Sequence, residues 1–492
     1  MSSGTNAFAA ADLGATSGRV VVGHVTRDSL HTEVVHRFAN TPVRLPDGLH
    51  WDVLGLYREI VTGLCRAADA APLASVGIDS WAVDYGLLDA DGTLIGAPFH
   101  YRDRRTEGAA EKVWKHVNGP ELYRITGLQH LAFNTVFQLA AAQDSVALSQ
   151  ARQLLLIPDL MTYWLTGSLG AEITNASTTG LFDASSGDWS SRITGALGLD
   201  RSILPGLRQP GEVAGQVLPH VSEEIGLTSP IDVLTVASHD TASAVAAVPA
   251  LEGTVAYISC GTWSLAGLEL EQPILNHAAR AANFTNERGV DGTIRFLRNI
   301  MGMWLLEECR RVWARQDRAA GQAEHADLIA QATAAPPFAA VVDPDAPDFA
   351  APGDMPARID AFCRRTGQHP PTSRGSLVRT ILEALALAHA RTLTEAAQLA
   401  GQQIDTVHLV GGGARNELLC QLTADATGLP VVAGPVEATA IGNILVQARA
   451  HGIVHDRHDL RALVARTQPL RRYTPSGPHR PWRDAAARLG LG

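Results

Sequence analysis

The sequence predicts an α/β protein built from two domains, and three observations support this prediction. The chain has 492 residues, and at roughly 100–200 residues per domain this length corresponds to two or three domains. A strand, a glycine-containing turn and a second strand open the chain at residues 8–25 and recur at residues 255–270. Each hairpin is followed by alternating strand-like and helix-like segments, which is typical of α/β domains. We therefore expect an N-terminal domain at residues 1–248 and a C-terminal domain at residues 249–492.

The elements of the N-terminal half follow from apolar runs and from helical periodicity. Strands are expected at residues 8–11, 20–25, 76–79, 84–89 and 231–237. Helices are expected at residues 54–71, 134–150 and 242–248. The last helix follows the polar run 238–241, which offers side chains suited to cap a helix N-terminus.

The C-terminal half repeats this pattern. Strands are expected at residues 255–259, 263–270, 407–410 and 431–433. The glycine-rich turn 411–416 leads from the third of these strands into a helix. The Ala/Pro-rich stretch 332–356 contains Phe338 and Phe349, so we expect an extended loop that packs on the surface of the protein.

Composition excludes several classes of protein. The formal net charge is −10, from 40 basic and 50 acidic residues, whereas a broad nucleic-acid-binding surface needs a basic surplus. The 5 cysteines are scattered, which fits a reducing compartment and not a disulfide scaffold. The first residues lack the basic and apolar regions of a signal peptide, and no apolar run reaches the about 20 residues of a bilayer span. We expect a soluble cytoplasmic protein that binds neither nucleic acid nor membrane.

Three small-residue turns at strand ends are candidates for phosphate binding. The turn Asp12–Arg19 offers successive backbone N–H groups, two hydroxyls and an arginine, and Asp12 is placed to hold a hydrated Mg²⁺. An ordinary β-hairpin turn is the alternative for this segment. Gly261-Thr262 and Gly411–Gly413 form the second and third turns. Three such turns in two halves favour a nucleotide held between the domains.

Asp240 has two interpretations. It follows an apolar strand and precedes a helix with few charges, where a carboxylate could accept a proton from a substrate hydroxyl. Aspartate is also a frequent N-cap, and its position alone favours that role.

The histidines His451, His455 and His458 share a helical spacing that could gather metal ligands. The neighbouring Gly452 and Asp456 favour a solvated helix end instead, and we expect no metal there.

Ten segments, taken in order, resemble the FGGY sugar kinases, and their residues are most similar to those of the rhamnulokinase branch. The resemblance runs from about residue 9 to residue 442. The segments are DLGATSGR, GIDSWAVDYGLLD, YRDRRT, PDLMTYWLTG, TNASTTGLFD, SHDTASAV, SCGTWSLAG, RNIMGMWLLEE, HLVGGGARNELLCQLTADATG and AGPVEATAIGN.

This resemblance implies two ribonuclease-H-like domains of the actin/hexokinase type, with a cleft that closes on ATP and sugar. The implied reaction is ATP-dependent phosphorylation of L-rhamnulose at its 1-hydroxyl. Asp240 would be the catalytic base, with Ala82, His239 and Thr241 at the sugar. The nucleotide would be contacted by Ala15, Thr16, Ser17, Gly18, Arg19, Thr262, Asn299, Glu307 and Gly412. Asp12 and Asp79 would hold Mg²⁺.

Two residues depart from the pattern of the branch. Ala82 stands where these kinases commonly have glycine, which bears on the identity of the sugar. Glu307 stands where the pattern often has glutamine. The departure at Ala82 leaves open another ketose kinase, acting on L-fuculose or xylulose. A separate alternative, from a different class, is a non-catalytic actin-like ATP-binding protein. The polar candidates Asp84, Arg102, Asp103 and Asn134 favour an enzyme over the latter.

Overall fold

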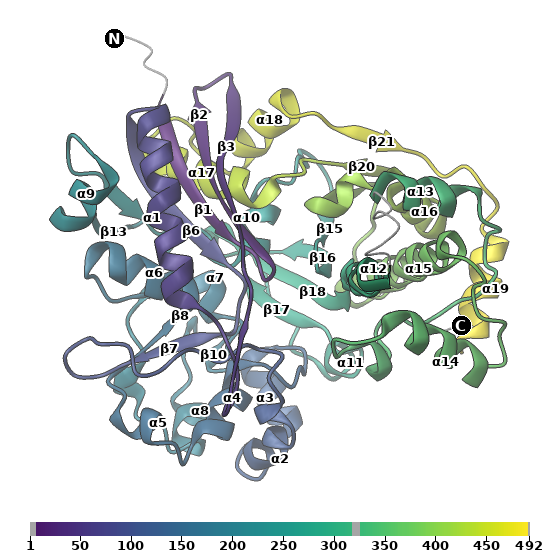
Figure 1. The fold of residues 1–492 in the computed structure, drawn as a ribbon, viewed down its shortest axis with the longest axis horizontal. Coiled ribbons are helices and arrows are strands. Elements are labelled where there is room, and N and C mark those ends of the chain that lie inside the picture. Colours follow the sequence, from purple (N-terminus) through teal and green to yellow (C-terminus); the bar gives the residue numbers. More distant parts are fainter. Residues whose placement is uncertain (1–5, 317–324, 491–492) are drawn as a thin grey trace. The chain divides into compact units, whose positions relative to one another are not determined.

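The computed structural model describes residues 6–316 and 325–490, which form two compact units (Figure 1). Among the described residues, the first unit contains 6–251, 269–296 and 438–468, and the second contains 252–268, 297–316, 325–437 and 469–490. The first unit therefore takes chain segments from both sides of residue 248. Each unit has its own β-sheet, so the α/β class with two domains is confirmed.

The sheet of the first unit has the strand order β13-β14-β6-β1-β2-β3. Its strands are β1 (Asn6–Leu13), β2 (Ser17–Val25), β3 (Leu30–Ala39), β6 (Leu73–Ser80), β13 (Val213–Gln216) and β14 (Asp232–Leu234). β1, β2 and β3 are antiparallel neighbours, whereas β6 runs parallel to both β1 and β14. Because β1 and β6 are parallel, their carboxyl ends meet at one edge of the sheet.

Two helices cover opposite faces of this sheet. Gly63 of α1 (Val53–Ala70) lies against the side chain of Val20, and Gly23 lies against Ile444 of α17 (Ala438–Ala450). Val20 and Gly23 are three residues apart on β2, and side chains alternate between the faces of a strand. Figure 1 shows α1 alongside the strands, with α17 next to β1, which it contacts.

The remaining helices and strands of the first unit are shorter elements outside this sheet. The helices are α2 (Ala109–Trp114), α3 (Gly119–Thr126), α4 (Thr135–Ala142), α5 (Val146–Gln150), α6 (Ile157–Thr166), α7 (Ile173–Ala176), α8 (Ser191–Ala196), α9 (Pro219–Ile225), α10 (Asp240–Ala246), α11 (His277–Ala281) and α18 (Arg457–Thr467). The short strands are β4 (Val43–Leu45), β5 (Gly48–His50), β7 (Tyr85–Leu88), β8 (Gln153–Leu156), β9 (Ala171–Glu172), β10 (Phe182–Asp183), β11 (Asp188–Trp189), β12 (Leu207–Arg208) and β17 (Thr285–Arg288).

The second sheet has the order β17-β18-β16-β15-β19-β20-β21, and from β18 onward it repeats the topology of the first sheet. Its edge strand β17 lies within the first unit. The other strands are β15 (Ala256–Cys260), β16 (Trp263–Leu270), β18 (Ile294–Met301), β19 (Val407–Val410), β20 (Val431–Ala433) and β21 (Arg471–Tyr473). The hairpin β15-β16 is antiparallel, β15, β19 and β20 are parallel, and β21 is antiparallel to β20. Each unit thus combines an antiparallel hairpin, two parallel strands and an antiparallel edge strand in the same order.

Six helices accompany the second sheet in the part of the chain that the structure describes, and the longest is α15. They are α12 (Trp304–Gln316), α13 (His325–Ala334), α14 (Met355–Arg365), α16 (Glu417–Thr427) and α19 (Arg480–Arg488), in addition to α15 (Arg374–Ala400). α15 begins with a capping box between Ser373 and Ser376, and its interior residues are mostly buried. The loop expected at residues 332–356 is shorter, because α13 extends to Ala334 and α14 begins at Met355. Between these helices, Val341, Val342 and Phe349 are fully buried, so this loop packs within the second unit.

Two predicted helices differ from those observed. The helix expected at residues 134–150 is two helices, because Ser145 accepts a hydrogen bond from the backbone N–H of Leu148 and starts α5 anew. The helix expected from residue 242 begins earlier, at Asp240. Over residues 6–316 and 325–490, no helix is long and apolar enough to cross a bilayer.

Candidate active site

Three acidic residues converge at the carboxyl edge of the first sheet. Asp12 and Asp79 are register partners at the ends of the parallel strands β1 and β6. The backbone N–H of Ser80 donates to the carbonyl of Ser238 (2.9 Å), and Ser80 forms a β-bridge with His239. This pairing brings the start of α10, and with it Asp240, to the strand ends that carry the other two carboxylates.

Asp79 is fully buried and lies in the field of the other two carboxylates. Burial, together with the negative charges of Asp12 and Asp240, raises its pKa well above the usual range, although a hydrogen bond from Asn443 Nδ2 to Oδ2 (2.6 Å) opposes this shift. Its other oxygen, Oδ1, is buried without a hydrogen-bond partner. A buried carboxylate oxygen that lacks a partner and lies beside a second carboxylate is a suitable ligand for a hard divalent cation.

The turn after Asp12 is tight because of two glycines. The N–H of Gly14 donates to the carbonyl of Ser17 (2.9 Å), and a side chain on Gly18 would collide with the ring of Phe38. Thr16 and Ser17 are exposed at the tip. A turn that leaves hydroxyls exposed, with no side chain at Gly14 or Gly18, is suited to an anionic ligand such as a phosphate.

Arg19 lies at the end of this turn and is held by the first carboxylate. Its Nε and Nη2 donate to Oδ2 of Asp12 at 2.8 and 2.6 Å. Arg19 thereby balances part of the negative charge at the strand ends and lowers the pKa of Asp79.

Asp240 is the first residue of α10, and no side chain caps this helix. The N-cap position belongs to His239, so capping does not account for Asp240. Its Oδ1 accepts a hydrogen bond from Thr241 Oγ1 (3.0 Å), and 32% of its side chain is exposed. Desolvation raises the pKa of Asp240, and the negative charge of Asp12 reinforces this shift. An accessible carboxylate with a raised pKa has the properties of a general base.

Three charged or polar groups surround His239. Its Nε2 lies 3.4 Å from Oδ1 of Asp240, and its Nδ1 lies 3.0 Å from Nη2 of Arg295 and 3.3 Å from Oε2 of Glu287. Arg295 also pairs with Glu287 at 3.0 Å. Burial alone would raise the pKa of Glu287, but the positive charge of Arg295 holds it below its usual range.

Glu172 fixes the segment that precedes α10. This buried carboxylate accepts hydrogen bonds from the N–H and hydroxyl groups of both Thr174 and Ser238, at 2.5–2.9 Å. Burial raises its pKa against the effect of these four bonds. Glu172 therefore anchors Ser238, and through the chain it positions His239 and Asp240.

Ala82 lies beside an unusual backbone position. The next residue, Val83, has φ of 71°, a conformation that a β-branched side chain rarely adopts. The carbonyl of Val83 accepts a hydrogen bond from Thr135 Oγ1 (2.7 Å), which holds this conformation. Asp84 follows and is buried, accepting from Trp51, Trp81, the N–H of Tyr101 and Gln138.

Asp84 is therefore a structural anchor behind Ala82, and burial raises its pKa to about 6 against the four hydrogen bonds. Asp103 and Asn134 also have local partners. Asp103 accepts from the N–H groups of Leu49 and Arg105, and Asn134 accepts from that of Leu131.

The nucleotide candidates of the second unit lie on four different elements. Thr262 forms the β15-β16 turn, and its carbonyl accepts hydrogen bonds from the N–H groups of Gly302 and Trp304, which join it to the start of α12. Glu307 is in the first turn of α12 and pairs with Arg310 at 2.9 Å. Asn299 lies on β18, and Gly412 is exposed after β19 with free space around its Cα. Gly411 between β19 and Gly412 has φ of 83° and packs on the carbonyl of Cys260.

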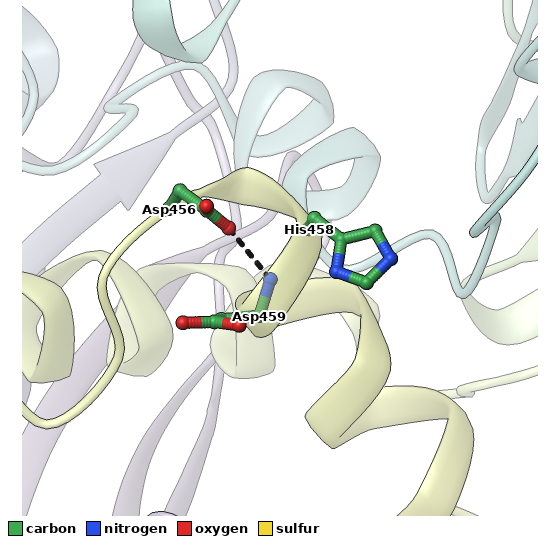
Figure 2. A group of neighbouring side chains, drawn as sticks. All are labelled: Asp456, His458 and Asp459. Atoms are coloured by element: carbon green, nitrogen blue, oxygen red, sulfur yellow. Dashed lines mark hydrogen bonds between the residues drawn. The ribbon is translucent and has the colours of Figure 1, made fainter.

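The histidine spacing near the end of the first unit does not form a ligand group. Figure 2 shows Asp456, His458 and Asp459 at the start of α18, where Oδ1 of Asp456 accepts a hydrogen bond from the N–H of Asp459 (2.8 Å). All three side chains are exposed, and Asp456 is the N-cap of the helix. Capping accounts for this cluster, in line with the expected solvated helix end.

Several functional candidates were not found from the sequence. Glu172, Glu287 and Arg295 contact residues 238–240 from positions at least 47 residues away in the chain. Each belongs to a buried segment, and charged residues in such segments are costly without partners. A charged residue within an otherwise apolar segment indicates in the sequence that a buried partner is needed. It does not indicate which residue that partner is.

The fold and site describe a two-domain α/β protein with a carboxylate cluster and a phosphate-type turn. The chain matches two family models: the FGGY family of carbohydrate kinases, N-terminal domain, at residues 8–247, and the C-terminal domain of the same family at residues 256–451. A rhamnulokinase from Bacteroides thetaiotaomicron is 44% identical over 95% of this chain and 96% of the relative. A rhamnulokinase from Pectobacterium carotovorum is 42% identical over 95% of this chain and 92% of the relative.

Solved structures share the fold at low sequence identity. Gluconate kinase from Lactobacillus acidophilus superposes with a TM-score of 0.77 at 16% identity, covering 99% of this chain and 96% of that chain. Xylulose kinase from Rhodospirillum rubrum gives a TM-score of 0.76 at 19% identity, covering 98% of this chain and 97% of that chain.

The chain belongs to the FGGY family of carbohydrate kinases. It is an ATP-dependent sugar kinase, with a sugar and ATP as its small-molecule partners.

Proposed function

We propose that the protein transfers the γ-phosphoryl group of ATP to the 1-hydroxyl of L-rhamnulose. The observation that carries this proposal is the 44% identity to a protein named rhamnulokinase over nearly the full length of both chains. Identity of this extent supports a shared substrate class more strongly than the fold does, because one fold hosts many sugar kinases.

In this proposal the first unit performs the chemistry on the sugar. Asp240 accepts the proton of the attacking hydroxyl, and His239, Thr241 and Ala82 contact the sugar. Residues Ala15 to Arg19 cradle the phosphates through backbone N–H groups and the Thr16 and Ser17 hydroxyls. Phosphoryl transfer demands positioning and charge stabilisation more than covalent chemistry, and these groups supply both.

The second unit contributes to nucleotide binding in the same proposal. Thr262, Asn299 and Gly412 contact the nucleotide. Glu307 pairs with Arg310, so a nucleotide contact from its carboxylate requires that this ion pair opens.

Mg²⁺ fits the carboxylates at the strand ends. Asp79 Oδ1 lacks a hydrogen-bond partner, and Asp12 stands opposite in the sheet register. We propose these two residues as the cation ligands. A bound Mg²⁺ would neutralise charge on the phosphates.

The proposed substrate is tested by an assay that couples ADP release to a panel of ketoses and glycerol. L-Rhamnulose is expected to give the highest kcat/KM. If L-fuculose or xylulose gives a higher value, the protein is a kinase of that ketose. If ADP release does not depend on any sugar, the protein is not a sugar kinase.

Replacing Ala82 with glycine is expected to change sugar selectivity. Removing one methyl from a pocket wall alters discrimination by about 1–3 kcal/mol, or roughly 10- to 200-fold. The ratio of kcat/KM between L-rhamnulose and other ketoses should therefore change, whereas KM for ATP should not. An unchanged ratio across the panel would place residue 82 away from the sugar.

Replacing Asp79 with asparagine is expected to have opposite effects on metal use and on stability. Burial and the charge of Asp12 raise the pKa of Asp79 and so disfavour its ionised form in the folded protein without a cation. The neutral amide should therefore raise the thermal midpoint in the presence of a chelator. The amide is a poorer ligand, so the Mg²⁺ concentration for half-maximal activity should rise. A lower thermal midpoint with an unchanged Mg²⁺ requirement would contradict the assignment.

A further inference from the structure

Arg295 and Glu287 lie against Nδ1 of His239, whereas Asp240 lies against Nε2. Arg295 is completely buried, and its Nη2 lies within hydrogen-bond distance of His239 Nδ1 (3.0 Å). Its Nε donates to the carbonyl of Arg288 (3.0 Å), and its Nη1 pairs with Oε2 of Glu287 (3.0 Å). The guanidinium is thus fixed by one carbonyl, one carboxylate and one imidazole nitrogen.

The contact with Arg295 favours one of the two tautomers of His239. Oε2 of Glu287 lies 3.3 Å from the same ring nitrogen, Nδ1, but is without a hydrogen-bond partner. A guanidinium has only donors, so Nδ1 of His239 must be the acceptor in the contact with Arg295. A neutral imidazole that accepts at Nδ1 carries its proton on Nε2. Nε2 is the nitrogen that faces Oδ1 of Asp240, at 3.4 Å.

We propose that Arg295, held in place by Glu287, is a positioning residue that keeps His239 in the neutral tautomer with its proton on Nε2, beside Asp240. This proposal rests on the proposed function only for the catalytic role of Asp240. In many sites, the hydrogen-bond partner of one ring nitrogen of a histidine fixes the tautomer of the ring in this way.

The consequence for the reaction follows from the charge of His239. An imidazolium next to Asp240 would stabilise the carboxylate and weaken it as a base, whereas a neutral ring leaves its basicity intact. The charged and titratable groups that face His239 are Asp240 on α10, Glu287 on β17 and Arg295 on β18. Glu172 holds the preceding residue, and Asp12 acts on Asp240 through its charge.

Removal of the guanidinium would reverse this arrangement. Nδ1 of His239 already lies 3.3 Å from Oε2 of Glu287, so it could then take a proton and donate to that carboxylate. A ring between two carboxylates favours the charged form. A protonated ring would weaken Asp240 as a base.

A direct test is the proton position on His239 in the full-length protein, read from ¹⁵N–¹H correlations of labelled histidine side chains. The signal of His239 is assigned by its loss in His239→Asn. The wild type is expected to show the Nε2–H tautomer, and Arg295→Met is expected to show a proton on Nδ1. A wild-type ring with its proton on Nδ1 would overturn the proposal, whether or not the protein phosphorylates a ketose.

Kinetics give the second test. Arg295→Met is expected to lower kcat by about 10- to 100-fold with little change in KM for ATP, and to move the acidic limb of kcat/KM to lower pH, because a positively charged ring stabilises the Asp240 carboxylate. Arg295→Lys keeps a cationic donor near Nδ1 and should recover part of kcat and the wild-type position of that limb.

The matched control is Arg461→Met, which removes a buried guanidinium paired with Glu269 (2.7 Å) in the same unit. This control is expected to lower the thermal midpoint without moving the pH limb or the proton of His239. If Arg295→Met and Arg461→Met give the same pH profile, Arg295 has only a structural role and the proposal fails. If the wild type phosphorylates no ketose while the tautomer is as expected, the proposed function fails and the positioning of His239 stands.

Discussion

Replacing Asp240 with asparagine is expected to lower kcat by about 10²- to 10⁴-fold, the usual contribution of a general base. The amide cannot accept the proton of the sugar hydroxyl, but it keeps the shape of the carboxylate and can still accept the hydrogen bond from Thr241. Sugar affinity should therefore largely survive. The measurement is kcat from coupled ADP release, with sugar binding followed separately by calorimetry.

Stability provides the control for this variant. Because desolvation raises the pKa of Asp240, its ionised form is disfavoured in the folded protein, and a neutral amide does not carry that cost. Asp240→Asn should therefore unfold at the same temperature as the wild type or at a higher one. A loss of kcat accompanied by a lower unfolding temperature would indicate a damaged fold, and near wild-type turnover would reject Asp240 as the base.

The pH profile of the wild type follows from the same shift. The reaction requires the ionised carboxylate, so kcat/KM should fall as the pH is lowered through the pKa of Asp240. A raised pKa places this acidic limb above pH ~4, the ordinary value for aspartate. The limb should disappear in Asp240→Asn over the pH range in which the protein stays folded.

The sequence was sufficient for the features that depend on neighbouring residues. Buried apolar runs predicted the hairpin strands β1, β2, β15 and β16, and the parallel register of β1 and β6 explains why Asp12 and Asp79 meet. The expected α/β class with two domains was confirmed, as was the FGGY family. These features follow from local patterns that strands and turns impose on the chain.

The features that depend on tertiary contacts could not be predicted. Arg295 and Glu287 reach His239 from strands that follow the end of the first sheet by more than 50 residues, and no local pattern distinguishes a buried ion pair from an exposed one. The tendency of aspartate to cap helices favoured an N-cap role for Asp240, but the chain pairing between Ser80 and His239 places the N-cap one residue earlier. In both cases a contact between distant segments decided the role of a residue.

Segments distant in the sequence also meet where α17 crosses α10. Gly442 of α17 lies so close to α10 that a Cβ on it would be 1.8 Å from the carbonyl oxygen of Ser243 and 2.5 Å from its carbonyl carbon. These are backbone atoms of the helix that begins with Asp240, and they cannot rotate away as a side chain would. The residue after Gly442 is Asn443, which donates to Asp79. The contact therefore fixes the distance between α10, which begins with the proposed base Asp240, and Asn443, which holds the proposed metal ligand Asp79.

Replacing Gly442 with alanine is expected to destabilise the protein and to slow the reaction. Overpacking by one methyl typically costs about 1–3 kcal/mol, and a collision with backbone places this site at or above the upper end. The helices must separate, which displaces Asp240, and a small displacement of a catalytic group can lower the rate by about 10²-fold. Thermal unfolding and kcat measure the two effects.

Gly195→Ala is the matched control for this substitution. Gly195 lies in α8 of the same unit, is exposed, and has no atom within 4 Å of the site where a Cβ would stand. Alanine there should be neutral or stabilising by up to about 1 kcal/mol, because it favours the helix. If Gly442→Ala resembled this control in both unfolding temperature and kcat, the close approach of α17 and α10 would not be what positions Asp240. Loss of kcat at an unchanged unfolding temperature would instead show that the approach serves catalysis more than stability.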